Sequence, residues 1–571
     1  MKRGGLLAMT YVGFVEVCVI LSPSTLLRAN SAKNPDGILH PFRMTRRGNV
    51  IFQKKTFSFY LFLFLLLSFF ALVLFYRLDH FTFWQDEAET ALLAKSIFLH
   101  GVPQTLFDDV WITQFHGKES TSQHLWYFTP WLPFYLCALG FKLFGMNEWG
   151  GRVLFALSGF FSAIMLGLIA WKWIKNRSVV VWTLFFYVTN VSVILYTRQC
   201  KYYPLYLLGS CLALYGILKW HENRRGFFLT ALGFLICFHC NYLSAFLAFF
   251  GFGCYTLSSK QLRPLFFKML LTILVFFGPF LLLASMSERS NIVSQWPSVL
   301  LYFKKLGTQF YYWNGQVFPF LLGFLLCWFR PPFLKFIGLT IISSFLLLPL
   351  VGSDLFRYNL HLIPLFCLLL GYLLYRSFAW NKYFGLSLFS ILTFTNILQN
   401  FPDAFVQKEI RPLFQKREWI ALKNYYFKAS QDPFKILPSF LPHLSPKNEH
   451  AFLNHDQMPW QWYLKMPLAY MAMSEKISSK TPPVPEHFLE KHEIDWWIGP
   501  HLVKMGDGPY LSEEEIVQLW REKGYRYERI DTQIPILYWD LNSPIRYRHF
   551  LERFSDDPKT TKTIHLIRRM K

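Results

Sequence analysis

Long apolar runs recur along the chain between residues 57 and 400, and short polar or basic segments separate them. A helix needs about 20 apolar residues to cross the hydrocarbon core of a bilayer, and many of these runs approach that length. We therefore predict a polytopic α-helical membrane protein of about eleven spans, with a few surface helices. The predicted spans are 56–76, 153–171, 179–196, 204–220, 227–238, 243–257, 268–284, 317–329, 333–351, 361–375 and 383–398.

One shorter apolar stretch, PWLPFYLCALGFKLF at 130–144, decides how the spans alternate between the two sides of the membrane. It has two prolines near its start and contains Lys142, so we interpret it as a surface or re-entrant helix. Counting it as a span would instead place Lys172, Lys175 and Arg177 outside, against the preference of basic residues for the cytoplasm. The first interpretation puts the N-terminus in the cytoplasm and the C-terminus outside.

The N-terminal segment, residues 1–55, is basic and is predicted to be cytoplasmic. Its first residues have a basic start and an apolar middle, as a signal peptide does, but Glu16 interrupts the apolar part. Met44 would be an ordinary cytoplasmic start before the first span. Residues 1–43 are therefore, as a hypothesis, a spurious or dispensable extension.

The remaining chain divides into two parts. Residues 56–402 form the predicted transmembrane domain, whose first external loop covers 78–151. Residues 403–571 are polar with Pro-rich connectors, and they predict an external, periplasmic α/β domain that is long enough for a core of its own. Its predicted strands are His450–Asn454, Asp495–Ile498, Tyr525–Ile530 and Ile534–Trp539, and its predicted helix is Ser512–Lys523.

Composition agrees with a membrane protein and narrows its partners. The chain is 53% hydrophobic and 16% charged, whereas soluble domains carry about 25% charged residues. The net charge is +23, and the basic residues cluster between apolar spans. Contact with anionic membrane lipids explains that arrangement better than binding to nucleic acid. We therefore expect the cytoplasmic membrane, and no nucleic acid, as the environment of this chain.

The stretch FTFWQDEAETALLAKSIFLHGVP, residues 81–103, directly follows the first span. It places Asp86 and Glu87 where a helix leaves the bilayer, and carboxylates at that position are candidates for a reaction centre. The alternative is structural, because Asp86 and Glu89 have the spacing of a capping box. The helix that follows is expected to lie on the membrane surface, with Ala88, Ala91, Leu92, Phe98 and Leu99 on its apolar face.

Basic and aromatic residues recur at two external ends of spans. The segment TRQCKYY offers Arg198 and Lys201, and the segment SDLFRYNLH offers Arg357 and Tyr358. Cations on this side run against the positive-inside rule, and Arg binds phosphate bidentately, so we favour an anionic lipid headgroup as their ligand. The alternative is that these arginines snorkel at the interface.

Three further external residues are candidates for lining a substrate, namely Tyr202, Tyr203 and His124. A tyrosine can sit at the membrane interface with its hydroxyl toward water. The histidines of the first loop have no metal-like spacing, so we predict no metal site. No cofactor motif is evident, and the sequence leaves a requirement for a divalent metal open.

Four motifs together resemble the GT-C superfamily of integral membrane glycosyltransferases, and among them family 39-like members. These include protein O-mannosyltransferases and bacterial aminoarabinose transferases. The motifs are QDEAETALLAKSIFLHGVP, PWLPFYLCALGFKLFGMNEWGGR, YTRQCKYYPLYLLGSCLALY and FRYNLHLIPLFCLLLGYLL, and they cover residues 85–374 discontinuously. The C-terminal domain resembles the external domains of such enzymes only in its position and size.

The resemblance implies a glycosyltransferase that moves a sugar from a polyprenyl-phosphate donor to a lipid, glycan or protein acceptor outside the cytoplasm. It implies Asp86 as the catalytic aspartate with Glu87 beside it, and basic residues such as Arg198, Lys201 and Arg357 as ligands of the donor phosphate. Two departures put the acceptor in doubt. Tyr202 and Tyr203 stand where aminoarabinose transferases have a second acidic residue, and TPWLP replaces the usual Pro-Pro after the first loop.

Elementary chemistry is consistent with that reaction. A polyprenyl phosphate leaves as a stable anion, so cations are needed to receive its charge and a carboxylate is needed to accept the proton of the attacking hydroxyl. One base and no sugar-bound enzyme intermediate would imply inversion at the anomeric carbon. A transporter or lipid flippase for cell-envelope precursors is the rival class, although no convincing inverted repeat is visible. A membrane scaffold with an external binding domain is a third.

Overall fold

The computed structural model of the chain describes most of the helical region and part of the C-terminal region. The described residues are 46–107, 110–112, 120–121, 123–285, 297–316, 332–350, 356–397, 400, 412–414, 416–427, 451–453, 457–463, 468–470, 496–500, 513–522, 524–535 and 563–570. The predictions for residues 1–43 and for a span at 317–329 lie outside these residues.

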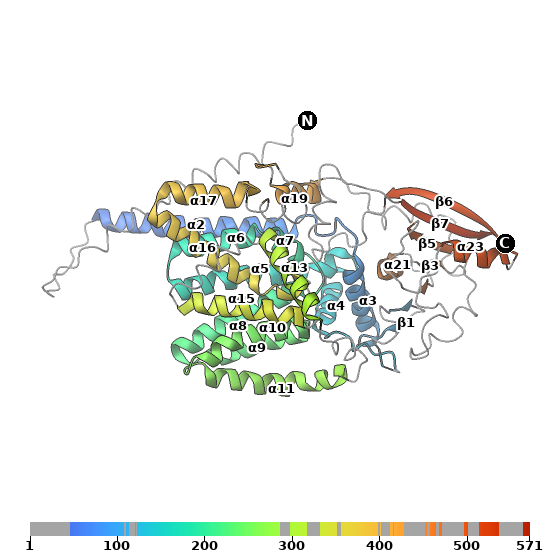
Figure 1. The fold of residues 1–571 in the computed structure, drawn as a ribbon, viewed down its shortest axis with the longest axis horizontal. Coiled ribbons are helices and arrows are strands. Elements are labelled where there is room, and N and C mark those ends of the chain that lie inside the picture. The colour runs from blue at the N-terminus through green and yellow to red at the C-terminus, as the bar shows by residue number, and fades with distance from the viewer. Residues whose placement is uncertain are drawn as a thin grey trace.

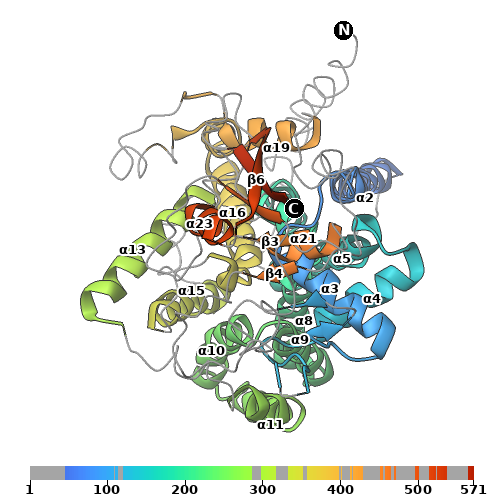
Figure 2. The same ribbon diagram turned by 90° about the vertical axis from the view of Figure 1, so that its right-hand side faces the viewer.

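The long helices lie side by side, and Figure 1 shows them running along the long axis of the molecule. Helices α3 and α4 lie at one end of this bundle, between it and a β-sheet formed by the C-terminal part of the chain (Figures 1 and 2). The helices are α2 (Arg46–Phe75), α3 (Gln85–His100), α4 (Leu132–Phe144), α5 (Glu148–Ile174), α6 (Arg177–Val188), α7 (Val191–Thr197), α8 (Tyr203–Asn223), α9 (Phe227–Cys240), α10 (Tyr242–Ser258), α11 (Arg263–Ser285), α13 (Val299–Gln316), α15 (Pro332–Leu350), α16 (Leu362–Trp380), α17 (Lys382–Phe394) and α19 (Arg417–Phe427), with a 3₁₀ turn η3 (Phe356–Asn359).

Every predicted span that falls within the described residues coincides with a helix or a broken pair of helices. Four helices are long and apolar enough to cross a membrane, or five if the bent pair α6–α7 counts as one span, within the part of the chain that the structure describes. Helices α9, α10, α15 and α17 are apolar but shorter. The chain is therefore a multi-pass membrane protein, and the total of about eleven spans stays a prediction.

The predicted span at 179–196 is broken rather than continuous. Helix α6 ends at Val188, α7 begins at Val191, and the two axes differ by 63°. The side chain of Asn190 accepts a hydrogen bond from the backbone N–H of Val193 and so caps α7. An Asn that bonds to the backbone favours a new helix start over continuation, which explains the break.

Two other segments bear on the sequence-based predictions. Residues 285–316 lie between two predicted spans, and their second part forms the amphipathic helix α13. Helix α4 has 13 residues, so it is about 20 Å long and too short to cross a bilayer core. That length agrees with the interpretation of 130–144 as a surface or re-entrant helix.

The capping-box alternative for Asp86 is wrong, because α3 begins at Gln85 and its N-cap is Trp84, which makes no side-chain capping bond. Asp86 is therefore already inside the helix. The expectation that α3 lies on the membrane surface with an apolar face is correct only in part. Residues Glu87–Ala94 are buried on every face of the helix, whereas Phe98 and Leu99 near its end are exposed.

The C-terminal part forms a five-stranded mixed sheet with the order β4-β3-β5-β7-β6. Strands β4, β3 and β5 are parallel, and β7 pairs antiparallel with both β5 and β6. The sequence predicted three of these strands but split β6 in two and missed β4 and β7. The elements are β3 (Ala451–Leu453), α21 (Gln457–Tyr463), β4 (Leu468–Tyr470), β5 (Trp496–Pro500), α23 (Glu513–Glu522), β6 (Arg526–Pro535) and β7 (Thr563–Met570), and a short hairpin, β1 (Leu106–Phe107) and β2 (Val110–Trp111), lies in the first loop.

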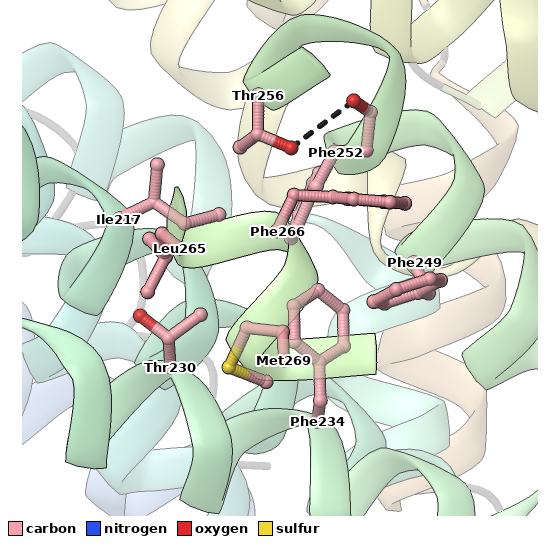
Figure 3. A pocket seen from close by; sticks show the side chains of 10 residues that line it. Ile217, Thr230, Phe234, Phe249, Phe252, Thr256, Leu265, Phe266 and Met269 are labelled. Carbon is pink, nitrogen blue, oxygen red and sulfur yellow. Dashed lines mark hydrogen bonds between the residues drawn. The ribbon is translucent and has the colours of Figure 1, made fainter. Parts of the chain in front are cut away.

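An apolar pocket lies between α8, α9, α10 and α11, and Figure 3 shows its side chains. Phenylalanines, Ile217, Leu265 and Met269 line most of it, and the Thr256 hydroxyl on its wall is bonded to the carbonyl of Gly253. Ile217 lies about 20 Å along α8 from Tyr203 at the start of that helix. The residues that line this pocket carry no charge, unlike the carboxylates and cations predicted for the reaction centre.

The predicted orientation can be tested with topology reporters. A reporter fused after Asn176, between α5 and α6, is expected to be cytoplasmic because Lys172, Lys175 and Arg177 surround it. A reporter fused after Asn400 is expected to be external. An external signal from the Asn176 fusion would show that the segment 130–144 crosses the membrane.

Candidate active site

The N-terminal turns of α3 carry three carboxylates, and each forms an ion pair with a cation from a different element. The three cations come from α5, from the connection between α7 and α8, and from η3. The pairs are Glu87 with Arg152 (Oε2 to Nη2, 2.6 Å), Glu89 with Lys201 (Oε1 to Nζ, 2.8 Å) and Asp86 with Arg357 (Oδ2 to Nη1, 2.7 Å). Residues far apart in the sequence thus meet at the end of the bundle where α3 lies (Figure 1).

Glu87 is fully buried, and its hydrogen bonds hold the surrounding backbone in place. Both of its carboxylate oxygens accept hydrogen bonds from Arg152, and Oε1 also accepts one from the backbone N–H of Cys200. Arg152 in turn donates to three backbone carbonyls of the segment between α2 and α3, those of Leu78, Phe81 and Thr82. This pair therefore ties α3 and the segment before it to α5, and it leaves Glu87 with little access to a substrate.

Glu89 and Lys201 form a second buried pair. Lys201 Nζ also lies 3.2 Å from the backbone carbonyl oxygen of Asp86, so it bridges both ends of the first helical turn. Burial raises the pKa of Glu89 above its ordinary value, although the nearby Lys201 ammonium acts in the opposite direction. Burial alone would lower the pKa of Lys201, but the carboxylates of Glu89 and Asp86 outweigh it and raise that pKa.

Asp86 and Arg357 form the most accessible of the three pairs, since 17% of each side chain is exposed. Glu87 and Arg152 expose 0% and 4% of theirs. Arg357 Nη1 also lies 3.2 Å from the hydroxyl of Tyr203, and its guanidinium carbon lies 5.4 Å from the ring centre of Tyr358. A partly exposed carboxylate and a partly exposed arginine are thus placed together at the start of α3.

Arg198 lies at the C-terminal end of α2. Its Nη1 and Nη2 donate to four backbone carbonyls, those of Val73, Leu74, Tyr76 and Arg77. It also lies over the rings of Tyr425 and Tyr426 of α19. The last carbonyls of a helix have no partner within it, so Arg198 in this state satisfies the end of α2.

The three candidate substrate-lining residues lie in different surroundings. Tyr203 contacts Arg357, and the ring of the buried Tyr202 is 4.4 Å from that of Tyr203, so both belong to the cluster around the accessible pair. His124 is exposed in the first loop, where its backbone bonds to Thr105 and Thr121. None of its hydrogen bonds within the described residues reaches Asp86 or Arg357.

Sequence reasoning assigned no role to Arg152 or Cys200, and it assigned none in the candidate site to Glu89. The three-residue spacing of Asp86 and Glu89 could have placed them on one helical face, but it was considered only as a capping motif. Arg152 stands at the end of the FKLFG-x-N-E-W-x-x-R segment without an evident partner in sequence. Within the residues that the structure describes, no three His, Cys, Asp or Glu side chains come together in a way that could bind a metal ion.

No family model matches the sequence, and neither does any curated protein. Several solved structures are similar. ArnT from Cupriavidus metallidurans in the apo state is 16% identical over 82% of this chain and 95% of that chain, with a TM-score of 0.53. ArnT from the same organism bound to undecaprenyl phosphate is 14% identical over 91% of this chain and 98% of that chain, also with a TM-score of 0.53.

A third structure is the archaeal oligosaccharyltransferase AglB from Archaeoglobus fulgidus, in complex with an inhibitory peptide and a dolichol-phosphate. It is 10% identical over 78% of this chain and 69% of that chain, with a TM-score of 0.42. ArnT is a GT-C aminoarabinose transferase. The similarity to ArnT extends over most of both chains, and this protein therefore shares its fold, the GT-C fold.

Proposed function

We propose that this protein is a membrane glycosyltransferase that moves a sugar from a polyprenyl-phosphate donor to an acceptor on the outer side of the cytoplasmic membrane. The observation that carries this proposal is the accessible Asp86–Arg357 pair, set among two buried ion pairs that fix α3 in place. A base and an anion ligand side by side are the two groups that this reaction requires. The GT-C fold and the binding of undecaprenyl phosphate to ArnT support the choice of donor.

In the proposed mechanism, the donor phosphate takes Arg357 away from Asp86. Phosphate and carboxylate compete for the same guanidinium, because both bind it through charge-assisted hydrogen bonds. Once Arg357 has moved to the phosphate, the Asp86 carboxylate can accept a proton. Donor binding would thus both anchor the leaving group and release the base.

The transfer step then follows with one base and one cation. The acceptor hydroxyl oxygen attacks the anomeric carbon while its proton passes to Asp86. The bond between that carbon and the phosphate oxygen breaks, and its electron pair stays on the phosphate, where Arg357 stabilises the charge. Attack from the face opposite the leaving phosphate inverts the anomeric configuration.

The surrounding residues have supporting roles in this proposal. Lys201 adds positive charge near the phosphate while Glu89 and the Asp86 carbonyl orient it. Tyr203 and Tyr358 flank Arg357 and would contact the bound donor. Glu87 and Arg198 keep α3 and the end of α2 in position rather than contacting substrate. The acceptor is a lipid, glycan or protein hydroxyl, and a divalent metal requirement is left to experiment.

Transfer is tested directly with purified protein and a synthetic polyprenyl-phosphate sugar. Mass spectrometry of cell-envelope lipids and glycans after deletion of the gene would identify the acceptor through the loss of one glycosylated species. The rival transporter or flippase predicts movement of the lipid-linked sugar across vesicle membranes with no new glycosidic bond. That result would overturn the proposal.

The role of Arg357 can be tested through the donor. Arg357→Ala is expected to raise the KM for the donor about 10-fold or more, since a charge-assisted contact to phosphate is lost. Arg357→Lys should recover part of this loss, because Lys retains the charge but not the planar fork. An unchanged donor KM in Arg357→Ala would assign this arginine to a structural role at the interface.

A further inference from the structure

The short helix α21, from the C-terminal part of the chain, packs against the segment that leads into α3. Figure 2 shows α21 in front of α3 and α5 when the molecule is viewed from the sheet end. The hydroxyl of Tyr463 accepts a hydrogen bond from the backbone N–H of Phe83, at 2.7 Å. The backbone N–H of Met458 donates to the side-chain oxygen of Gln85, at 3.3 Å. Both contacts fall within the three residues before Asp86.

Tyr463 also connects this segment to α5. Its hydroxyl donates to Oε1 of Glu148, the first residue of α5, at 2.8 Å. One turn further along α5 stands Arg152, which binds Glu87. Helix α5 therefore holds the chain on both sides of Asp86. Before Asp86, Glu148 binds Tyr463, which binds Phe83; after Asp86, Arg152 binds Glu87.

Aromatic packing adds to these bonds. The ring of Trp462 stacks on Phe141 of α4, with centres 5.5 Å apart, and meets Phe83 edge-on at 5.4 Å. Burial, together with the neighbouring Glu148 carboxylate, raises the pKa of Tyr463, so its hydroxyl stays protonated and can donate to Glu148. The residue that caps α3, Trp84, supplies no side-chain bond, so the start of this helix depends on contacts from elsewhere.

We propose that Tyr463 is a positioning residue for the transfer reaction. Through Phe83 and Glu148 it fixes where α3 begins, and it thereby sets the place of Asp86 opposite Arg357. The inference rests on the proposed function, and it gives α21 a role in positioning the catalytic carboxylate. The reason for a tyrosine is that one hydroxyl can accept from the Phe83 N–H and donate to Glu148 at the same time.

The substitution Tyr463→Phe tests this role, because it removes both hydrogen bonds and keeps the ring. We expect kcat to fall about 10-fold while the KM for the donor changes little, since a small displacement of a catalytic group lowers the rate without removing donor contacts. In an Asp86→Asn background the same substitution should lower kcat no further, because its effect passes through the Asp86 carboxylate. Tyr527→Phe is the matched control, since that hydroxyl accepts from Arg521 within the C-terminal part of the chain.

Hydrogen exchange gives a second measurement that does not depend on activity. Backbone amides of residues 81–90 should exchange faster in Tyr463→Phe and in Glu148→Leu than in wild type or Tyr527→Phe. Glu148→Gln, which keeps an oxygen acceptor for Tyr463, should stay close to wild type. A kcat equal to that of wild type, a full additional loss in the Asp86→Asn background, or unchanged exchange would each overturn the proposal. A wild-type protein without transfer activity would instead refute the proposed function, and exchange would still decide whether Tyr463 fixes α3.

Discussion

Replacement of Asp86 by Asn is expected to lower kcat for glycosyl transfer at least about 100-fold, because the amide cannot accept the proton of the acceptor hydroxyl. The fold should survive this change. Asp86 lies inside α3 rather than at its N-cap, and Asn can still accept a hydrogen bond from Arg357. The lost charge at the positive end of α3 would cost about 0.3–1 kcal/mol of stability.

Transfer would be measured with a polyprenyl-phosphate sugar and detergent-solubilised protein, and binding of the donor would be measured separately. Asp79→Asn is the matched control, since Asp79 is an exposed carboxylate before α3. We expect Asp86→Asn to bind the donor and fail to turn it over, while the control turns over normally. Near-normal transfer by Asp86→Asn would remove Asp86 as the base and direct the search to Glu89, which lies on the same helical turn.

The second large effect concerns stability. Arg152→Met is expected to destabilise the protein by about 3–5 kcal/mol, because it leaves the Glu87 carboxylate buried without its cation. The carbonyls of Leu78, Phe81 and Thr82 would lose their donors at the same time. The double variant Arg152→Met/Glu87→Leu should recover part of the loss, since no unpaired charge then remains in the interior.

Thermal unfolding in detergent, followed by the fraction of protein that stays monodisperse, measures this effect. Lys172→Met is the matched control because Lys172 forms an ion pair with the exposed Glu222, and such surface pairs contribute about 0–1 kcal/mol. If Arg152→Met were no less stable than Lys172→Met, the Glu87–Arg152 pair would not be what holds α3 in place. Retained stability would also reopen Glu87 as a group that contacts substrate.

The helical membrane architecture and the position of the acidic residues could be predicted from the amino-acid sequence. Long apolar runs can satisfy their backbone in a bilayer only as helices or closed barrels, and their lengths matched helices. The acidic pair after the first span predicted the region of the candidate site, because carboxylates where a helix leaves the bilayer are candidates for a reaction centre. The resemblance carried by four motifs predicted the GT-C fold, which the similarity to ArnT confirms.

Local pattern did not reveal the helix starts and breaks that depend on single side chains. The capping-box spacing of Asp86 and Glu89 suggested a helix start, but tertiary contacts move that start to Gln85 and use Glu89 to bind Lys201. The apolar run at 179–196 looked continuous, yet Asn190 begins a second helix within it. The sequence pattern did not predict strand β7, because its basic residues obscure the alternation of apolar positions.

The cation that each carboxylate binds is set by the folding of distant segments against α3. The partners of Asp86, Glu87 and Glu89 lie 271, 65 and 112 residues away, and no local rule connects them. The contacts of Arg198 with the carbonyls that end α2 were likewise not evident from its sequence context. Burial distinguishes these ion pairs. The Glu87–Arg152 pair is enclosed, whereas the Asp86–Arg357 pair keeps part of both side chains exposed.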